Sequence, residues 1–363
     1  MKILFLTNIP SPYRVTFFNE LGKSCVLIVA FEGNFATDRN QQWQTENAVH
    51  FTAVWLNGLR LGSDKFLSFS MLKLLQQGWD AVIVGGYSTP TGMLAIEYMR
   101  LKKIPFYLEV DGGIIRPDNK LKFNLKKHFI SAASGWFSSG KETTQYLTHY
   151  GANPAKIYEY PFTSLMEKDI LQQVPTAEQK RILRKELGIT EEKVLISVGQ
   201  FIRRKGYDIL LQAANHLPKD IGIYIIGDKP TAEYLALQKE LNLTQVHFVG
   251  FQSKEKLQKW YQAADVFVLP TREDIWGLVI NEAMGQGLPI ITTDKCVAGL
   301  ELVKEGENGY IVPVEDAPAL TQAITRLFSQ DYRQMGQKSL ELIKPYTIEN
   351  MAQCHLEVLN GKH

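Results

Sequence analysis

Short apolar runs alternate along the chain with segments whose apolar residues recur at helical spacing. The runs show no period-two alternation, which is typical of parallel strands covered by helices on both faces. We predict strands at 2–7, 25–31, 81–86, 106–110, 194–199, 222–227, 246–250, 266–270 and 288–293, and helices at 14–21, 206–214, 254–264 and 348–359. The pattern therefore predicts an α/β fold with doubly wound sheets.

A change in composition divides this pattern into two series. Residues 164–191 are polar and helical in pattern, and the strand-like runs restart after them. A chain of 363 residues also exceeds what one hydrophobic core usually serves. We therefore expect two Rossmann-like domains, 1–165 and 166–345, facing each other across a cleft, with the C-terminal helix 346–363 joined to the first domain.

Composition and charge narrow the class of protein. The net charge of +2 gives no whole-protein signal for nucleic acid. Residues 1–165 carry 17 Lys and Arg against 12 Asp and Glu, whereas the remainder carries 23 against 26, so the first half is expected to meet something anionic. The three cysteines are far apart, no Cys or His spacing suits a metal, and no stretch reaches membrane-spanning length. We expect a cytoplasmic protein without a bound metal.

The most informative segment is 271–289, which follows a predicted strand and opens a helix near Gly277. Backbone N–H groups at a helix start have no helical partners, so those of 275–279 are expected to face an anion. Asp274 precedes the start and Glu282 follows within two turns, and a carboxylate accepts several hydrogen bonds from sugar hydroxyls. Taken alone, these acids are explained equally well without a ligand: Glu273 and Asp274 would cap the helix, and Glu282 would be a solvated helix residue.

The spacing Asp274-x7-Glu282, with Trp-Gly-Leu between the acids and Gly-Leu-Pro behind them, resembles the acidic signature of the retaining GT-B glycosyltransferases of family 4. The resemblance implies that Glu282 binds the ribose of a nucleotide-sugar donor and that Asp274 contacts the transferred sugar. The family usually has Glu at the first position, where this chain has Asp274, so either the backbone lies closer or Glu273 takes over the contact. The donor-binding residues implied in this segment are Asp274, Ile275, Trp276, Gly277, Leu278 and Glu282.

A second segment, 198–208, follows a strand and precedes a helix, which is where a diphosphate binds. It is similar to the family's phosphate loop, and the match implies that Lys205 stabilises the departing diphosphate. Gln200 stands where the family usually has Arg, so Arg203 or Arg204 is expected to supply that charge. A solvated basic loop is the alternative. The donor-binding residues implied here are Gly199, Gln200, Arg204 and Lys205.

Candidate acceptor residues follow two strands of the first half. Tyr13 and Arg14 come after the first strand and are expected to touch acceptor or phosphate. Asp111 and Gly112 follow the strand at 106–110, where relatives in the family place a His near the reacting sugar. Asp111 can bind a sugar hydroxyl or accept a proton from the acceptor, although a simple turn also explains Asp-Gly-Gly. Our predicted catalytic residues are thus Asp274, Lys205 and Asp111.

The segment from Lys120 to Phe129 is basic and amphipathic, with Leu121 and Leu125 at helical spacing from Phe129. This pattern suits peripheral contact with anionic lipid headgroups at the inner face of a membrane. A solvated helix face that covers the core explains it equally well.

The order of these motifs implies a retaining glycosyltransferase of the hexosyltransferase type. It would move a sugar from a nucleotide-diphosphate sugar, with UDP expected from family frequency, to a glycan or lipid-linked acceptor in polysaccharide or glycolipid synthesis. Cationic side chains can neutralise the diphosphate, so neither a metal nor another cofactor is expected. Two alternatives stay open: a nucleotide-sugar epimerase or phosphorylase-like enzyme of the same fold, and a non-catalytic sugar-nucleotide-binding protein.

Overall fold

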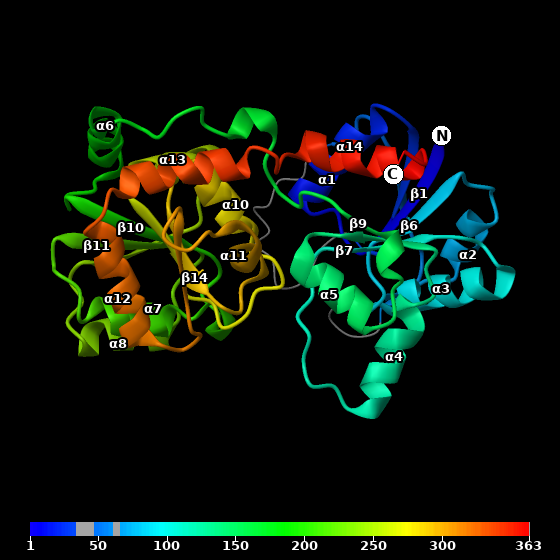
Figure 1. Cartoon of the computed structure of the whole chain (residues 1–363), viewed down its shortest axis with the longest axis horizontal. Helices are drawn as coiled ribbons and strands as arrows, with labels where there is room; N and C mark the ends of the chain where they lie inside the picture. The colour runs from blue at the N-terminus through cyan, green and yellow to red at the C-terminus, as the bar shows by residue number, and fades with distance from the viewer. Residues whose placement is uncertain (34–46, 61–65, 363) are drawn as a thin grey trace. The chain divides into compact units, whose positions relative to one another are not determined.

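The computed structural model describes residues 1–33, 47–60 and 66–362. The chain divides into unit 1, which comprises Met1–Thr163 and Tyr346–His363, and unit 2, which comprises Ser164–Pro345. Each unit has its own parallel sheet and its own hydrophobic core (Figure 1). The α/β prediction with two Rossmann-like halves is therefore confirmed.

Unit 1 is built on a parallel sheet in the order β3-β2-β1-β6-β7-β8-β9. Its strands are β1 (Lys2–Thr7), β2 (Val26–Phe31), β3 (Thr52–Trp55), β6 (Ala81–Val84), β7 (Tyr107–Val110), β8 (Gly135–Ser138) and β9 (Ile157–Glu159), and β4 (Leu59–Arg60) and β5 (Phe66–Leu67) form a separate antiparallel pair. Its helices are α1 (Pro12–Gly22), α2 (Ser70–Leu75), α3 (Pro90–Lys102), α4 (Lys120–Ile130), α5 (Lys141–His149) and α14 (Ile348–Leu359), with a 3₁₀ turn at Pro154–Lys156.

Unit 2 is built on a parallel sheet in the order β12-β11-β10-β13-β14-β15. Its strands are β10 (Lys193–Val198), β11 (Ile221–Ile226), β12 (Val246–Val249), β13 (Val266–Leu269), β14 (Ile290–Thr293) and β15 (Gly309–Val312). Its helices are α6 (Ala177–Leu187), α7 (Tyr207–Ala214), α8 (Ala232–Glu240), α9 (Lys254–Ala263), α10 (Leu278–Gly285), α11 (Val297–Leu302), α12 (Ala317–Phe328) and α13 (Tyr332–Ile343), with 3₁₀ turns at Glu167–Asp169 and Arg203–Lys205.

In each sheet the first strand along the chain lies in the centre. The following strands are added outward on one side of it and then on the other, which is the doubly wound order. The reversal lies between β1 and β6 in unit 1 and between β10 and β13 in unit 2. Loops that leave the carboxyl ends of such neighbouring strands form the usual ligand site of this kind of sheet. In unit 2 these are the loops that contain the two motifs singled out in the sequence.

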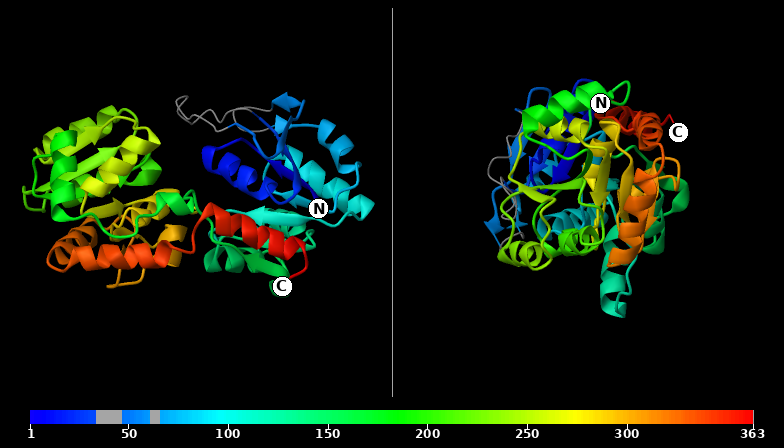
Figure 2. Two further views of the ribbon diagram at one scale, coloured as in Figure 1. Left: turned by 90° about the horizontal axis from the view of Figure 1, so that it is seen from above. Right: turned by 90° about the vertical axis from the view of Figure 1, so that its left-hand side faces the viewer.

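The C-terminal helix belongs to unit 1. In Figures 1 and 2, α14 runs beside α1, and the two helices pack against each other. Its apolar face is buried through Ile348, Met351 and Val358, as the helical spacing predicts. His355 lies on the same face and is 0% exposed, so this helix carries a histidine into the core of unit 1.

Candidate functional site

Two loops of unit 2, one after β10 and one after β13, are joined by hydrogen bonds. The Arg272 N–H and the Thr271 hydroxyl both donate to the carbonyl oxygen of Arg204, at 2.8 and 2.9 Å. The Arg204 guanidinium donates back to the carbonyl oxygen of Glu273 at 3.0 Å. The Arg272 guanidinium binds both carboxylate oxygens of Asp208 at 2.8 and 2.6 Å. These bonds fix the two loops against each other.

The joined loops bring Lys205 and Asp274 together. Lys205 Nζ lies 2.7 Å from Asp274 Oδ2, and both residues are 8% exposed. Arg204 Nη1 lies 3.6 Å from the same carboxylate oxygen, with its side chain partly exposed. Two predicted catalytic residues and one predicted donor-binding residue therefore meet at the carboxyl edge of the unit 2 sheet.

Gly199 and Gln200 lead into this ion pair from β10. The Gly199 N–H donates to Ile226 O at 2.9 Å, and a Cβ on Gly199 would lie 3.3 Å from Lys205 Cε and 2.8 Å from Tyr207 Oη. Glycine here thus leaves room for the lysine stem. Gln200 is exposed on the same loop, where its carbonyl oxygen accepts from Ile202 N at 2.8 Å.

The turn that enters α10 is shaped by Gly277, which has φ +102° and precedes the first helical residue, Leu278. The predicted helix start near Gly277 is confirmed. Trp276 is 2% exposed, and its indole N–H donates to Asn281 Oδ1 at 2.9 Å. Ile275 is 52% exposed. Trp276 thus anchors the turn to α10, whereas Ile275 lies at the surface.

Glu282 lies in the second turn of α10 and is partly buried. The Ser164 hydroxyl donates to Oε1 at 3.1 Å, and the Tyr261 hydroxyl donates to Oε2 at 3.2 Å. Burial raises the pKa of Glu282, and the two hydroxyl donors oppose that rise. The sequence analysis did not name Ser164 or Tyr261. A tyrosine on the apolar face of the predicted α9 helix was a usable signal, because a buried hydroxyl usually has a polar partner.

In unit 1 the predicted acceptor residues form a second cluster. The Tyr13 hydroxyl donates to Asp111 Oδ2 at 3.2 Å, and the Arg14 guanidinium binds both Asp111 and Glu109. The Arg14 side chain is only 5% exposed, whereas that of Asp111 is 28% exposed. The sequence predicted that Arg14 contacts the acceptor directly. We propose that it instead positions the carboxylates of Asp111 and Glu109. Tyr13 and Asp111 keep the surface position.

The two carboxyl groups of this cluster differ in their electrostatic surroundings. Burial raises the pKa of Asp111, the Glu109 charge adds to the rise, and Arg14 opposes it. Burial acts on Glu109 too, but Arg14 and His355 together outweigh it and lower the pKa of Glu109 to about 2. Glu109 is thus a fixed anion, and Asp111 is the carboxyl group whose charge responds to its neighbours.

Gly112 and Gly113 complete the turn after β7. Gly112 is partly buried, and Gly113 is buried against the Tyr146 ring, where a Cβ would lie 2.5 Å from Cγ. The close approach explains why a glycine follows at this point and shows that the turn beside Asp111 packs tightly.

Comparison with protein families identifies the larger part of unit 2. Residues 179–342 match the family described as glycosyl transferases group 1. Residues 179–342 belong to the group 1 glycosyl transferases. This match contains both joined loops and α10, and therefore Lys205, Asp274 and Glu282.

Curated relatives of this chain are named glycosyltransferases. It is 28% identical over 224 residues to D-inositol 3-phosphate glycosyltransferase of Xylanimonas cellulosilytica, covering 57% of this chain and 52% of that protein. It is 26% identical over 221 residues to the lipopolysaccharide glucosyltransferase WaaG of Escherichia coli, covering 56% and 54%. The chain thus spans about half the length of the curated relatives it matches.

Solved structures extend the likeness to the whole chain. The structure of HepE from Anabaena in complex with UDP superposes with a TM-score of 0.80 at 17% identity, covering 99% of this chain and 100% of that one. Sucrose-phosphate synthase from Thermosynechococcus elongatus gives 0.77 at 20% identity, covering 100% and 99%. The chain therefore has the GT-B fold over its full length.

The predicted membrane segment is helix α4, which lies at the margin of unit 1 (Figures 1 and 2). Phe129 is buried, whereas Leu121 and Leu125 are 81% and 48% exposed, so the expected apolar stripe is divided. Lys122 and Lys126 pair with Asp118 at 3.1 and 2.7 Å. Among the described residues, no helix has both the length and the apolar character needed to cross a bilayer.

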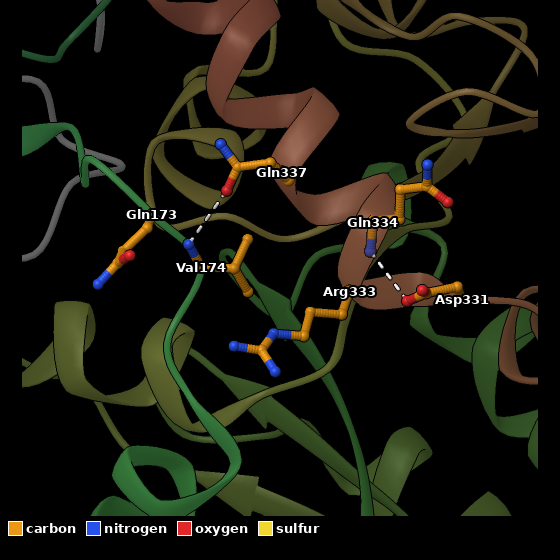
Figure 3. Close-up of a pocket in the computed structure, with 6 residues that line it drawn as sticks. All are labelled: Gln173, Val174, Asp331, Arg333, Gln334 and Gln337. Atoms are coloured by element: carbon orange, nitrogen blue, oxygen red, sulfur yellow. Dashed lines mark hydrogen bonds between the residues drawn. The ribbon is translucent and has the colours of Figure 1, made fainter.

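A surface hollow of about 360 Å³ lies elsewhere in unit 2. Figure 3 shows its side chains extending in different directions from α13 and from the segment before α6. Two of its contacts are local: Val174 N donates to Gln337 Oε1 at 3.4 Å, and Gln334 N donates to the capping Asp331 at 3.0 Å. Its lining contains none of the predicted site residues: Gln173, Val174, Asp331, Arg333, Gln334 and Gln337.

Gly206 is the residue on which the joined loops depend sterically, and Gly206→Ala is expected to destabilise unit 2. Its φ is +69°, and an added Cβ would lie 2.0 Å from Pro270 O. Gly188→Ala is the matched control, because Gly188 has φ +72° but nothing within 4 Å. Both variants carry the left-handed backbone cost of about 1–2 kcal/mol, and only Gly206→Ala adds the clash. Urea denaturation would measure both, and equal losses would contradict this view of the loops.

Proposed function

We propose that the chain is a retaining glycosyltransferase that moves a sugar from a nucleotide-diphosphate sugar, UDP-sugar first, to a glycan or lipid-linked acceptor. The observation that supports this proposal most directly is the nearly buried Lys205–Asp274 ion pair in the two joined loops, with Arg204 beside it. HepE, which shares the fold, has been solved with UDP and with UDP-glucose. The curated relatives suggest polysaccharide or glycolipid synthesis as the setting.

In this proposal unit 2 binds the donor. Lys205 and Arg204 present positive charge where the diphosphate leaves, and this stabilisation grows as negative charge develops on the leaving group. Asp274 holds Lys205 in place and accepts hydrogen bonds from the transferred sugar. Glu282 has both carboxylate oxygens oriented by hydroxyl donors, which leaves further lone pairs for the ribose hydroxyls.

In unit 1, Asp111 and Tyr13 bind the acceptor hydroxyl. We propose that the acceptor attacks the face of the sugar from which the diphosphate departs, so that the anomeric configuration is retained without a covalent intermediate. The two cations can neutralise the leaving group, and we propose that transfer needs no metal or other cofactor. Undiminished transfer in the presence of a chelator would support this.

The donor site is tested by calorimetry with UDP, GDP, dTDP and their common sugar conjugates. We expect UDP to bind selectively and Glu282→Ala to weaken it about 10- to 100-fold, since a carboxylate bonded to ribose hydroxyls contributes about 1.5–3 kcal/mol. Glu240→Ala, which removes an exposed carboxylate at the end of α8, is the control and should bind as the unaltered protein does.

Calorimetry together with an assay of turnover separates the alternatives. Absence of nucleotide binding in the unaltered protein would contradict the proposal. Binding without turnover over any acceptor would instead indicate a sugar-nucleotide-binding protein. Nucleotide release without an acceptor product, or dependence on phosphate, would indicate the epimerase or phosphorylase class.

We propose that the enzyme works in the cytoplasm and contacts the inner face of the membrane through α4. Lys120 and Lys127 are exposed and, unlike Lys122 and Lys126, do not pair with Asp118, so they suit a test by substitution. We expect Lys120→Gln/Lys127→Gln to weaken co-sedimentation with anionic vesicles about tenfold at low salt. Neutral vesicles should bind neither protein.

The apolar contribution of α4 is tested with Leu121→Ser, and Leu235→Ser is its matched control. Leu235 is 47% exposed in unit 2, and only the α4 variant should reduce vesicle binding. Equal binding of all variants would refute a membrane role for this helix.

A further inference from the structure

A buried charged pair in unit 1 connects the C-terminal helix to the Asp111 cluster. His355, on α14, is 0% exposed, and Glu109, on β7, is 1% exposed. His355 Nε2 lies 3.0 Å from Glu109 Oε2. The proposed function above assigns no role to either residue, and a buried pair of this kind costs free energy unless its hydrogen bonds are complete.

Both ring nitrogens of His355 face acceptors. Nδ1 lies 2.7 Å from the carbonyl oxygen of Met351, and Nε2 lies against the Glu109 carboxylate. A carbonyl oxygen and an ionised carboxylate only accept, and a neutral imidazole carries only one N–H. Both contacts are hydrogen bonds only when both nitrogens carry hydrogen. The geometry therefore describes an imidazolium cation, stacked on Phe137 at a ring distance of 4.2 Å.

Glu109 joins this cation to the acceptor residues. Its Oε2 accepts from His355, and its Oε1 accepts from Arg14 and, at 3.2 Å, from the Tyr160 hydroxyl. Arg14 uses its other terminal nitrogen on Asp111 Oδ1. The Tyr160 hydroxyl also lies 3.2 Å from that oxygen, and its single O–H is shared between the two carboxylates. An unbroken set of hydrogen bonds thus runs from α14 to the carboxylate proposed to meet the acceptor.

We propose that His355 is a positioning residue that, through Glu109 and Arg14, keeps Asp111 ionised and correctly oriented for the acceptor. The proposal rests on the proposed function only in taking Asp111 as the residue that binds the acceptor. The link between His355 and the charge of Asp111 stands on the contacts within unit 1.

Charge balance gives the link its direction. The cluster holds two cations, Arg14 and His355, and two carboxylates, Glu109 and Asp111. Loss of the His355 charge leaves one excess negative charge among buried groups. Glu109 keeps its bond to Arg14, so the excess is relieved at the more exposed carboxylate, Asp111, which takes up a proton more readily.

The neighbours of His355 and Asp111 are the other groups whose titration could affect the charge of Asp111. His355 faces Glu109 on β7 and Tyr160 after β9, and its other ring contacts are Phe17 and Phe137. Burial raises the pKa of Tyr160 well above its usual value, and the two carboxylates add to the rise, so Tyr160 stays neutral. The charged and titratable groups that face Asp111 are Arg14, Tyr13, Tyr160 and Glu109.

The test compares the full chain with His355→Gln, which keeps a donor for Glu109 but removes the charge. Nitrogen NMR of ¹⁵N-histidine-labelled protein reports the charge of His355, assigned by the signal missing from the variant. Carbon NMR of carboxyl-labelled aspartate follows the titration of Asp111, assigned with Asp111→Asn. We expect an imidazolium at neutral pH, and an Asp111 titration shifted upward by about one pH unit or more in His355→Gln. Gln353→Ala, an exposed change on the same helix, should shift nothing.

The outcomes separate this proposal from the proposed function. A neutral His355 ring in the unaltered protein would overturn the proposal, even if His355→Gln failed to fold. A charged ring with an unmoved Asp111 titration would overturn the link between them. Where transfer is measurable, the acid limb of kcat/KM should move upward with the Asp111 titration. Absence of any transfer in the unaltered protein would count against the proposed function and leave the NMR result standing.

Discussion

Replacing Lys205 by Met is expected to abolish most transfer activity and to destabilise unit 2. The ammonium is nearly buried and lies 2.7 Å from Asp274, so its loss leaves a carboxylate without its main partner. Breaking a buried pair in this way costs about 3–5 kcal/mol of the free energy of unfolding. Loss of the cation that we propose stabilises the leaving group is expected to lower kcat about 10²- to 10³-fold. Urea denaturation and initial rates of transfer from the UDP-sugar measure the two effects.

The double variant Lys205→Met/Asp274→Asn separates the two roles. It removes both charges, so we expect most of the lost stability to return, because replacement of a whole buried pair is often nearly neutral. Transfer should stay as low as in the single variant, since the double variant restores neither the cation nor the proposed sugar contact of Asp274. Recovery of activity together with stability would show that Lys205 acts only as a structural partner of Asp274.

The fold follows from sequence wherever apolar runs are long. Strands such as β10 and β11 are six residues long and buried throughout apart from the first residue of β10, which gives a clear pattern. The strands not predicted from the sequence are β3, β4, β5, β8, β9 and β15, which have two to four residues and therefore show little periodicity. Length alone does not explain their omission, because the predicted strand β6 also has four residues. The first helix begins at Pro12, earlier than position 14, because proline is favoured in the first turn of a helix.

The site follows from sequence only in part. The motifs place Lys205 and Asp274 after separate strands, and the two meet because β10 and β13 are neighbours in the sheet. The family match and the motifs point to these residues, but their roles stay predictions. Partners such as Ser164, Tyr261 and His355 come from other elements, and local patterning does not encode which helix covers which strand.

One overlooked residue did carry a signal. Glu109 lies in the middle of the apolar run at 106–110, and a carboxylate in a strand covered on both faces is rarely buried without a cation. The charge of Glu109 therefore called for a partner, and the structure supplies Arg14 and His355. The same reasoning predicts that Arg14 pairs with a carboxylate within its own unit, and in the structure it pairs with Glu109 and Asp111.

Asp111→Asn is expected to lower kcat/KM for transfer about 10²-fold or more, the range for loss of a group that takes a proton in the transition state. UDP affinity should be unchanged, because the donor is proposed to bind in unit 2. Glu282→Ala should show the opposite division, with weakened UDP binding. Asp80→Asn, at an exposed position elsewhere in unit 1, is the control and should alter neither quantity.

The pH dependence gives the sign of the Asp111 effect. Burial and the Glu109 charge raise the pKa of Asp111, so the carboxyl takes up its proton at a higher pH than an ordinary aspartic acid, for which the value is about 3.9. Only the ionised form accepts a proton from the acceptor, so kcat/KM should fall as the pH is lowered through this raised pKa. The acid limb should disappear in Asp111→Asn, leaving a low rate that is flat over the same range. A limb that persists unchanged in this variant would assign the titration to another group and remove Asp111 from the reaction.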